Sequence, residues 1–118
     1  MCGVVAVVAQ RGVLPELCDA LNFIKHRGQD AVGLTLYSVA SKRFHTVRKP
    51  GLARDAMTDF AALPTTADMG IGHVRYPTAG TLSAEEIQPF WASSPYGIAL
   101  AHNGNLINTQ ILRHSLLR

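Results

Sequence analysis

The sequence predicts a single α+β domain, in which helices pack against antiparallel strands. Apolar runs rich in β-branched residues alternate with helical patterns, and two neighbouring strand-like runs read as a hairpin. No regular strand–helix–strand repeat is present, so a parallel sheet is not indicated. With 118 residues, 47% hydrophobic and 16% charged, the chain has the composition of one globular domain with a core.

The first strand is predicted at residues 3–9, where a continuous apolar run is typical of a strand buried on both faces. A helix is predicted over residues 15–25, with Gly28 as a stop signal. Its apolar residues recur at helical spacing: Leu17, Leu21 and Ile24. Cys18 lies beside this stripe, which favours a buried structural thiol.

The middle of the chain predicts a hairpin and a second helix. Residues 31–39 alternate as a strand, and residues 43–48 pair back after a turn. Residues 53–63 have the pattern of an amphipathic helix that ends before Pro64. Residues 69–76 form a glycine-rich strand, and such glycines often mark close approach by a ligand or another backbone.

The last third contains a long irregular stretch, a strand and a helix. Residues 77–96 include three prolines, and loops of this length are uncommon unless they are functional. Residues 97–101 read as a buried strand, and a helix follows with Asn105 or Asn108 as N-cap. That helix reaches Arg118 with an apolar stripe that needs a partner, so we expect a domain that is incomplete at its C-terminal end.

The distribution of charge and the cysteine content argue against several classes of function. The net charge of +3 comes from eleven basic and eight acidic residues that are scattered along the chain, which argues against nucleic-acid binding. No signal peptide is recognised, and no apolar run is long enough to span a bilayer, so no membrane partner is expected. Cys2 and Cys18 lack metal-ligand spacing. A reducing cytoplasm fits these features.

Cys2 is the first candidate catalytic residue, because only Met1 precedes it. Removal of Met1 would leave one residue with both a thiol and a free α-amino group. The amine, with a reference pKa of roughly 7.7–8.0, can act as general base for the thiol. The alternative is that a cysteine at this position is accidental.

Asn103 and Gly104 follow a predicted strand and are candidates for an oxyanion hole. A side-chain amide and a backbone N–H can converge there on developing negative charge. Asn-Gly is also a strong hairpin signal, but a helical pattern follows it here instead of a strand.

Arg75 and Thr78 are candidates for binding a carboxylate. An exposed strand-end arginine and a simple turn are the alternatives. Residues 26–30 form a polar loop that includes Arg27 and Gly28, and an ordinary helix-ending loop is the alternative there. His73 and His102 flank the presumed site without recognised ligand spacing, so we expect structural histidines and no metal site.

The chain resembles the glutaminase domain of the amidophosphoribosyltransferase family, also called glutamine phosphoribosylpyrophosphate amidotransferases. The matching stretches occur in the family's order and cover nearly the whole chain: MCGVV at 1–5, HRGQDA at 26–31, GIGHVRYPTAG at 70–80, QPF at 88–90, SPYG at 94–97 and AHNGNL at 101–106. HRGQD, GHVRYPTAG and AHNGN distinguish this family from sugar-phosphate aminotransferring synthases of the same superfamily.

The resemblance implies an N-terminal-nucleophile hydrolase fold, an αββα sandwich of two antiparallel sheets between helical layers. It implies that Cys2 attacks the side-chain amide of L-glutamine. Asn103 and Gly104 match the family's oxyanion hole, and Arg75 and Thr78 match the groups that hold the glutamine α-carboxylate. Arg27 and Gly28 match the segment that packs over the nucleophile and positions its amine.

It also implies that residues 1–118 are the N-terminal part of a class II glutamine amidotransferase domain, and that the phosphoribosyltransferase domain is absent. We expect no cofactor in this chain, with Mg²⁺ and phosphoribosylpyrophosphate used only by the missing domain. In the full enzyme, expected to be a cytoplasmic homo-oligomer, ammonia would give phosphoribosylamine in the first step of purine biosynthesis. An iron–sulfur cluster in the absent region is left open. Alternatives are an inactive remnant that docks on a partner, or the glutaminase domain of another class II amidotransferase.

Overall fold

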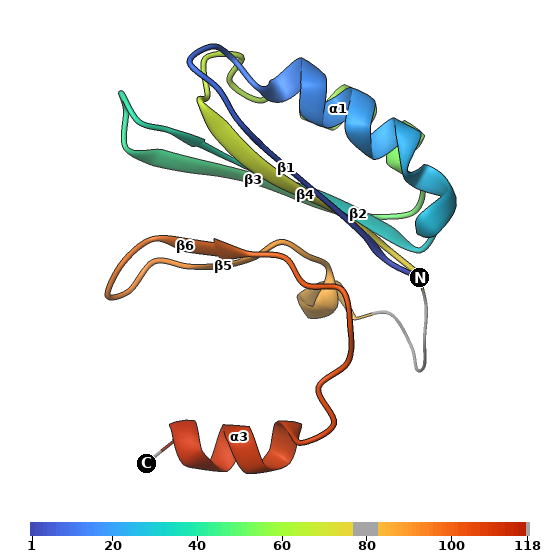
Figure 1. Ribbon diagram of the computed structural model, residues 1–118, viewed down its shortest axis with the longest axis vertical. Coiled ribbons are helices and arrows are strands. Elements are labelled where there is room, and N and C mark those ends of the chain that lie inside the picture. Colours follow the sequence, from blue (N-terminus) through green and yellow to red (C-terminus); the bar gives the residue numbers. More distant parts are fainter. Residues whose placement is uncertain (77–82, 118) are drawn as a thin grey trace.

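The computed structural model describes residues 1–76 and 83–117, and it contains two antiparallel sheets (Figure 1). The larger sheet has four strands in the order β1-β4-β2-β3. Its strands are β1 (Gly3–Val8), β2 (Ala31–Ser38), β3 (Arg43–Pro50) and β4 (Met69–Arg75). The smaller sheet is a hairpin of β5 (Phe90–Ala92) and β6 (Ile98–Leu100). The predicted α+β class is confirmed.

The two helices that cover the core lie on one face of the larger sheet, and the hairpin lies on the opposite face. The helices are α1 (Leu14–Phe23), α2 (Met57–Ala61) and α3 (Thr109–Leu116), with short 3₁₀ turns η1 (Lys25–Arg27), η2 (Ala53–Ala56) and η3 (Ala84–Glu86). In Figure 1, α1 covers one face of the sheet, the β5-β6 hairpin lies along the other, and α3 lies beyond the hairpin.

The core lies between the sheet and the helices α1 and α2. Leu17, Leu21 and Phe60 are fully buried there against strand residues of β2 and β4. Gly70 and Gly72 of β4 make room for α1, because a Cβ atom at these positions would lie 2.6 Å from Leu17 Cδ1 and 2.9 Å from Leu21 Cδ2. The expected close approach at this strand therefore comes from leucine side chains of α1.

Two strands are less buried than the sequence predicted. β1 was expected to be buried on both faces, but Val4 is 40% exposed and Val8 is 76% exposed, because burial alternates along the strand and only the face with Val5 and Val7 packs against the core. β6 was also expected to be buried, but Ile98 is 54% exposed and Leu100 is 58% exposed. β2 is buried along nearly its whole length because it lies between β4 and β3.

Two other segments differ from the prediction. The second helix begins as the 3₁₀ turn η2 before α2. The stretch at 77–96, expected to be irregular, contains η3 and β5 within its described part. α3 begins at Thr109 with Asn108 as its N-cap, one of the two predicted positions, although the Asn108 side chain makes no capping bond. Over residues 1–76 and 83–117, no helix is both long and apolar enough to cross a membrane.

Candidate active site around Cys2

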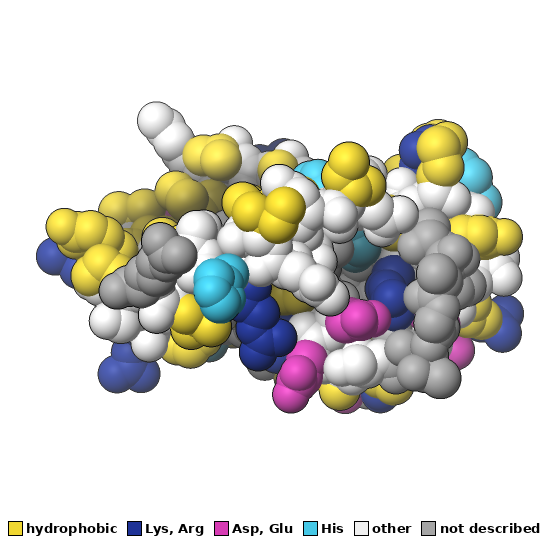
Figure 2. Space-filling model, turned by 90° about the horizontal axis from the view of Figure 1, so that it is seen from below, with side chains coloured by type: hydrophobic (Ala, Val, Ile, Leu, Met, Phe, Trp, Pro, Cys, Tyr) yellow, Lys and Arg dark blue, Asp and Glu magenta, His cyan; other side chains and the backbone are white. Residues whose placement is uncertain are grey.

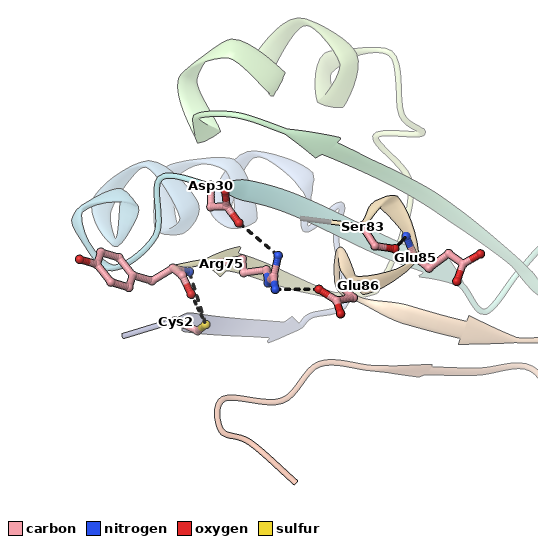
Figure 3. Close-up of polar contacts among 7 residues, drawn as sticks. Cys2, Asp30, Arg75, Ser83, Glu85 and Glu86 are labelled. Atoms are coloured by element: carbon pink, nitrogen blue, oxygen red, sulfur yellow. Dashed lines mark hydrogen bonds and ion pairs between the residues drawn. The ribbon is translucent and has the colours of Figure 1, made fainter. Parts of the chain in front are cut away.

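The thiol of Cys2 lies at the end of β4. Pairing of β1 with β4 aligns Gly3 with Val74. As a result the Tyr76 backbone N–H donates to Cys2 Sγ at 3.5 Å, and Sγ lies 3.9 Å from the Tyr76 carbonyl oxygen (Figure 3). The sulfur is thus held next to the residue that follows Arg75.

Two predicted site residues converge on the main chain of Cys2. The carbonyl oxygen of Cys2 accepts a hydrogen bond from Arg27 Nε at 3.1 Å and another from Asn103 Nδ2 at 3.2 Å. Arg27 comes from η1, and Asn103 follows β6, so three segments that are distant in sequence meet at one point. This arrangement gathers Cys2, Arg27 and Asn103.

Gly28 and Gly104 fit backbone positions that would not accept a side chain. A Cβ atom on Gly28 would lie 2.6–2.7 Å from backbone atoms of Val74 and Arg75, so this loop packs directly on the end of β4. Gly104 has a φ of +146°, a region that disfavours side chains, and a Cβ atom there would meet the His102 ring at 2.9 Å.

Arg75 is held by two carboxylates instead of being exposed at the strand end. Its Nη1 lies 3.1 Å from Asp30 Oδ2 and its Nη2 lies 2.8 Å from Glu86 Oε2, with the Arg75 side chain only 14% exposed. Figure 3 shows Asp30 and Glu86 on either side of the guanidinium. Sequence reasoning missed both acids, since neither belongs to a paired-carboxylate pattern; only the position of Asp30 within the HRGQD stretch pointed to it.

Gln88 is a second residue that sequence reasoning missed. Its side-chain Oε1 accepts a hydrogen bond of 2.6 Å from the backbone N–H of His102, the residue before Asn103. The segment after η3 thus supports the loop that carries both oxyanion candidates. The signal was present in the stretch Gln88-Pro89-Phe90, which was noted as a family match without a role.

His73 is a buried histidine beneath this loop. It is 1% exposed, and its Nε2 has no hydrogen-bond partner among the described residues. Burial lowers the pKa of His73 below 6.5, while hydrogen bonds to the His102 backbone and the Asn103 side chain oppose the shift. Burial thus favours the neutral form of the imidazole.

Several predicted features contribute nothing further to this geometry. Thr78 lies outside the described residues. Cys18 is a free, partly buried thiol, and burial raises its pKa. Across residues 1–76 and 83–117, no three His, Cys, Asp or Glu residues gather to hold a metal ion.

The proteins that match this chain in sequence and in structure are amidophosphoribosyltransferases. The chain is 45% identical to the amidophosphoribosyltransferase of Pasteurella multocida over 118 residues and 47% identical to that of Escherichia coli over 116 residues. These matches cover 100% and 98% of this chain. This chain is related to the amidophosphoribosyltransferases.

The chain spans about 23% of the length of either amidophosphoribosyltransferase. One solved structure that matches is the glutamine phosphoribosylpyrophosphate amidotransferase of B. subtilis in complex with ADP and GMP, with a TM-score of 0.79 and 26% identity over 99% of this chain and 25% of that one. A second, described as the allosteric regulatory enzyme of purine biosynthesis, gives a TM-score of 0.82 over the same shares. No protein-family model matches the chain. The fold class of the amidophosphoribosyltransferase glutaminase, an N-terminal-nucleophile hydrolase, is confirmed.

Proposed function

We propose that this chain is the nucleophile-bearing part of a class II glutamine amidotransferase domain and that Cys2 releases ammonia from glutamine. The observation that supports this most is the convergence of Arg27 and Asn103 on the main chain of Cys2, with Arg75 one residue from the backbone that contacts its sulfur. Both the sequence relatives and the solved structures are amidotransferases of this kind.

The nucleophile forms when Met1 is removed. In the chain that retains Met1, the nitrogen of Cys2 is an amide and has no basic lone pair. Met1 is 78% exposed, so an aminopeptidase can reach it. Once Met1 is gone, the α-amino group of Cys2 takes the proton of its own thiol.

Glutamine hydrolysis then proceeds in two steps. The thiolate of Cys2 attacks the side-chain amide carbon, and the proton held by the α-amino group moves to the amide nitrogen, which leaves as ammonia. A thioester between Cys2 and the glutamyl group remains. Water attacks this thioester, the sulfur takes back a proton, and glutamate is released.

Asn103 and Gly104 stabilise the negative oxygen that develops in both steps. Asn103 Nδ2 already lies 3.2 Å from the carbonyl oxygen of the nucleophile residue, and the N–H of Gly104 follows in the same loop. Removing one such donor typically costs about 2.7–4 kcal/mol of transition-state stabilisation.

The α-carboxylate of glutamine binds Arg75, with Thr78 as a second donor. A guanidinium pairs with a carboxylate through two N–H groups, which fixes the orientation of the substrate as well as its charge. Arg27 and Gly28 hold the main chain of Cys2 against β4, and so position its amine.

In the whole enzyme we propose that the ammonia reacts with phosphoribosylpyrophosphate to give phosphoribosylamine, the first step of purine biosynthesis. That reaction belongs to a phosphoribosyltransferase domain outside this chain, which would also use the Mg²⁺. The enzyme is proposed to be a cytoplasmic homo-oligomer.

The test uses a chimera in which this chain replaces the matching 23% of the Escherichia coli relative. Cys2→Ser should abolish glutamine-dependent phosphoribosylamine synthesis and leave ammonia-dependent synthesis intact. Loss of both activities would mean that Cys2 is needed for folding, and retention of the glutamine-dependent activity would refute its role as nucleophile.

A further inference from the structure

The two carboxylates on Arg75 differ in exposure and in origin. The side chain of Asp30 is 23% exposed, and Asp30 stands directly before the central strand β2. The side chain of Glu86 is 54% exposed, and Glu86 is the last residue of the short turn η3. Asp30 bonds Nη1 and Glu86 bonds Nη2. The less exposed acid therefore anchors the guanidinium at Nη1, and the more exposed acid holds Nη2.

A substrate carboxylate that pairs with Arg75 meets the negative charge of Glu86. A bidentate pair uses two of the five N–H groups of the guanidinium, and Asp30 and Glu86 already hold one nitrogen each, Nη1 and Nη2. Glu86 Oε2 lies 2.8 Å from Nη2, so a substrate carboxylate at that nitrogen has to share it with Glu86 and is repelled by the negative charge of Glu86.

We propose that Glu86 is an internal competitor of the substrate: it occupies the α-carboxylate position on Arg75 until glutamine displaces it. This inference rests on the proposed role of Arg75 in glutamine binding. Displacement is feasible because the Glu86 side chain is 54% exposed, so water screens the pair and solvates the released carboxylate. η3 has only three residues, so a small local change frees the side chain.

The direction in which Glu86→Gln changes ligand binding separates competition from structural support. If Glu86 competes, neutralising it removes both the internal occupant and its repulsion of the incoming carboxylate, so ligand binding improves. If Glu86 only steadies Arg75, neutralising it loosens the guanidinium and weakens binding.

The experiment measures how fast a glutamine-like diazo-ketone, 6-diazo-5-oxo-L-norleucine, labels Cys2 of the 118-residue chain after mass spectrometry has verified loss of Met1. Glu86→Gln is compared with Glu85→Gln, which makes the same charge change one residue away. Among the described residues Glu85 forms no ion pair, and Figure 3 shows it turned away from Arg75. Iodoacetamide, which carries no carboxylate, reports the intrinsic reactivity of the thiol.

We expect Glu86→Gln to raise the labelling rate by the diazo-ketone about two- to fivefold, while Glu85→Gln and the iodoacetamide rate stay unchanged. An unchanged or slower rate in Glu86→Gln overturns the inference. If the Gln variant does not fold, as judged by circular dichroism, Glu86→Ala replaces it under the same criterion.

An Arg75→Gln variant separates this inference from the proposed function. If Arg75→Gln slows the diazo-ketone but Glu86→Gln has no effect, only the competition by Glu86 is refuted. If Arg75→Gln labels at the wild-type rate, or if the wild-type chain is not labelled, the proposed glutamine site fails and the inference falls with it.

Discussion

At the scale of single residues, the site depends on how closely the Gly28 loop packs against β4. A methyl group on Gly28 would lie 2.6 Å from the Val74 carbonyl carbon, and backbone atoms cannot give way as a flexible side chain can. We expect Gly28→Ala to destabilise the chain by about 1–3 kcal/mol. Gln29→Ala, at an exposed neighbouring position, should change stability by less than about 0.5 kcal/mol.

Urea unfolding followed by circular dichroism measures the free energy of unfolding of both variants. Equal stability of Gly28→Ala and the wild type would show that the loop does not pack on β4 as described.

His73 gives the fold a predictable pH dependence. Burial lowers its folded-state pKa below 6.5, so as the pH falls through about 6.5 the unfolded chain binds the proton first and the free energy of unfolding decreases. Above that pH both states are neutral and the effect vanishes. We expect His73→Gln to flatten the loss of stability between pH 7 and pH 5.

Urea unfolding at several pH values measures this slope, with His114→Gln as the control because His114 is exposed on α3. A wild-type slope that persists in His73→Gln, or that disappears in His114→Gln, would contradict the assignment.

At the scale of elements, the segment after η3 supports the loop that follows β6. Gln88 Oε1 accepts from the His102 N–H at 2.6 Å, so removal of the side chain releases the backbone next to Asn103. A lost hydrogen bond of this kind costs about 0.5–1.5 kcal/mol, and we expect Gln88→Ala to lower kcat for glutamine hydrolysis about two- to tenfold.

Steady-state kinetics on the chimera measure kcat and KM for glutamine hydrolysis. KM should change little, since Gln88 does not contact the carboxylate site, and Gln88→Glu, which retains an acceptor oxygen, should recover most of the rate. A change confined to KM, or no recovery in Gln88→Glu, would refute the positioning role.

Most of the elements could be predicted, because their periodicity is local. The strands β1 to β4 and α1 fall within two residues of the expected positions. Exposure could not be predicted, because it depends on which faces other elements cover: β1 and β6 have apolar sequences, but each has exposed apolar side chains. The partners of Arg75 were equally hidden, since Asp30 is 45 positions away and no local pattern joins the two residues.

At the scale of the whole molecule, α3 is the part least integrated into the structure. None of its residues is buried, and its apolar side chains are exposed: Ile111 is 72% exposed and Leu116 is 83% exposed. Figure 2, which views this end of the molecule, shows hydrophobic side chains spread over the surface. An isolated helix shorter than about 12 residues is marginal in water.

We therefore expect amide hydrogens of the eight-residue α3 to exchange at rates near those of an unfolded peptide, while those of β2 and β4 are protected. Hydrogen exchange read by mass spectrometry measures this difference. Strong protection of α3 in the 118-residue chain would show that its apolar face is covered in solution.

The most direct test of the central claim is peptide mapping of the chain after reaction with the glutamine-like diazo-ketone. The account predicts that Met1 is absent, that a single adduct lies on Cys2, and that the partly buried Cys18 is unmodified. A chain that keeps Met1 and still reacts at Cys2, or an adduct on Cys18 alone, would contradict it.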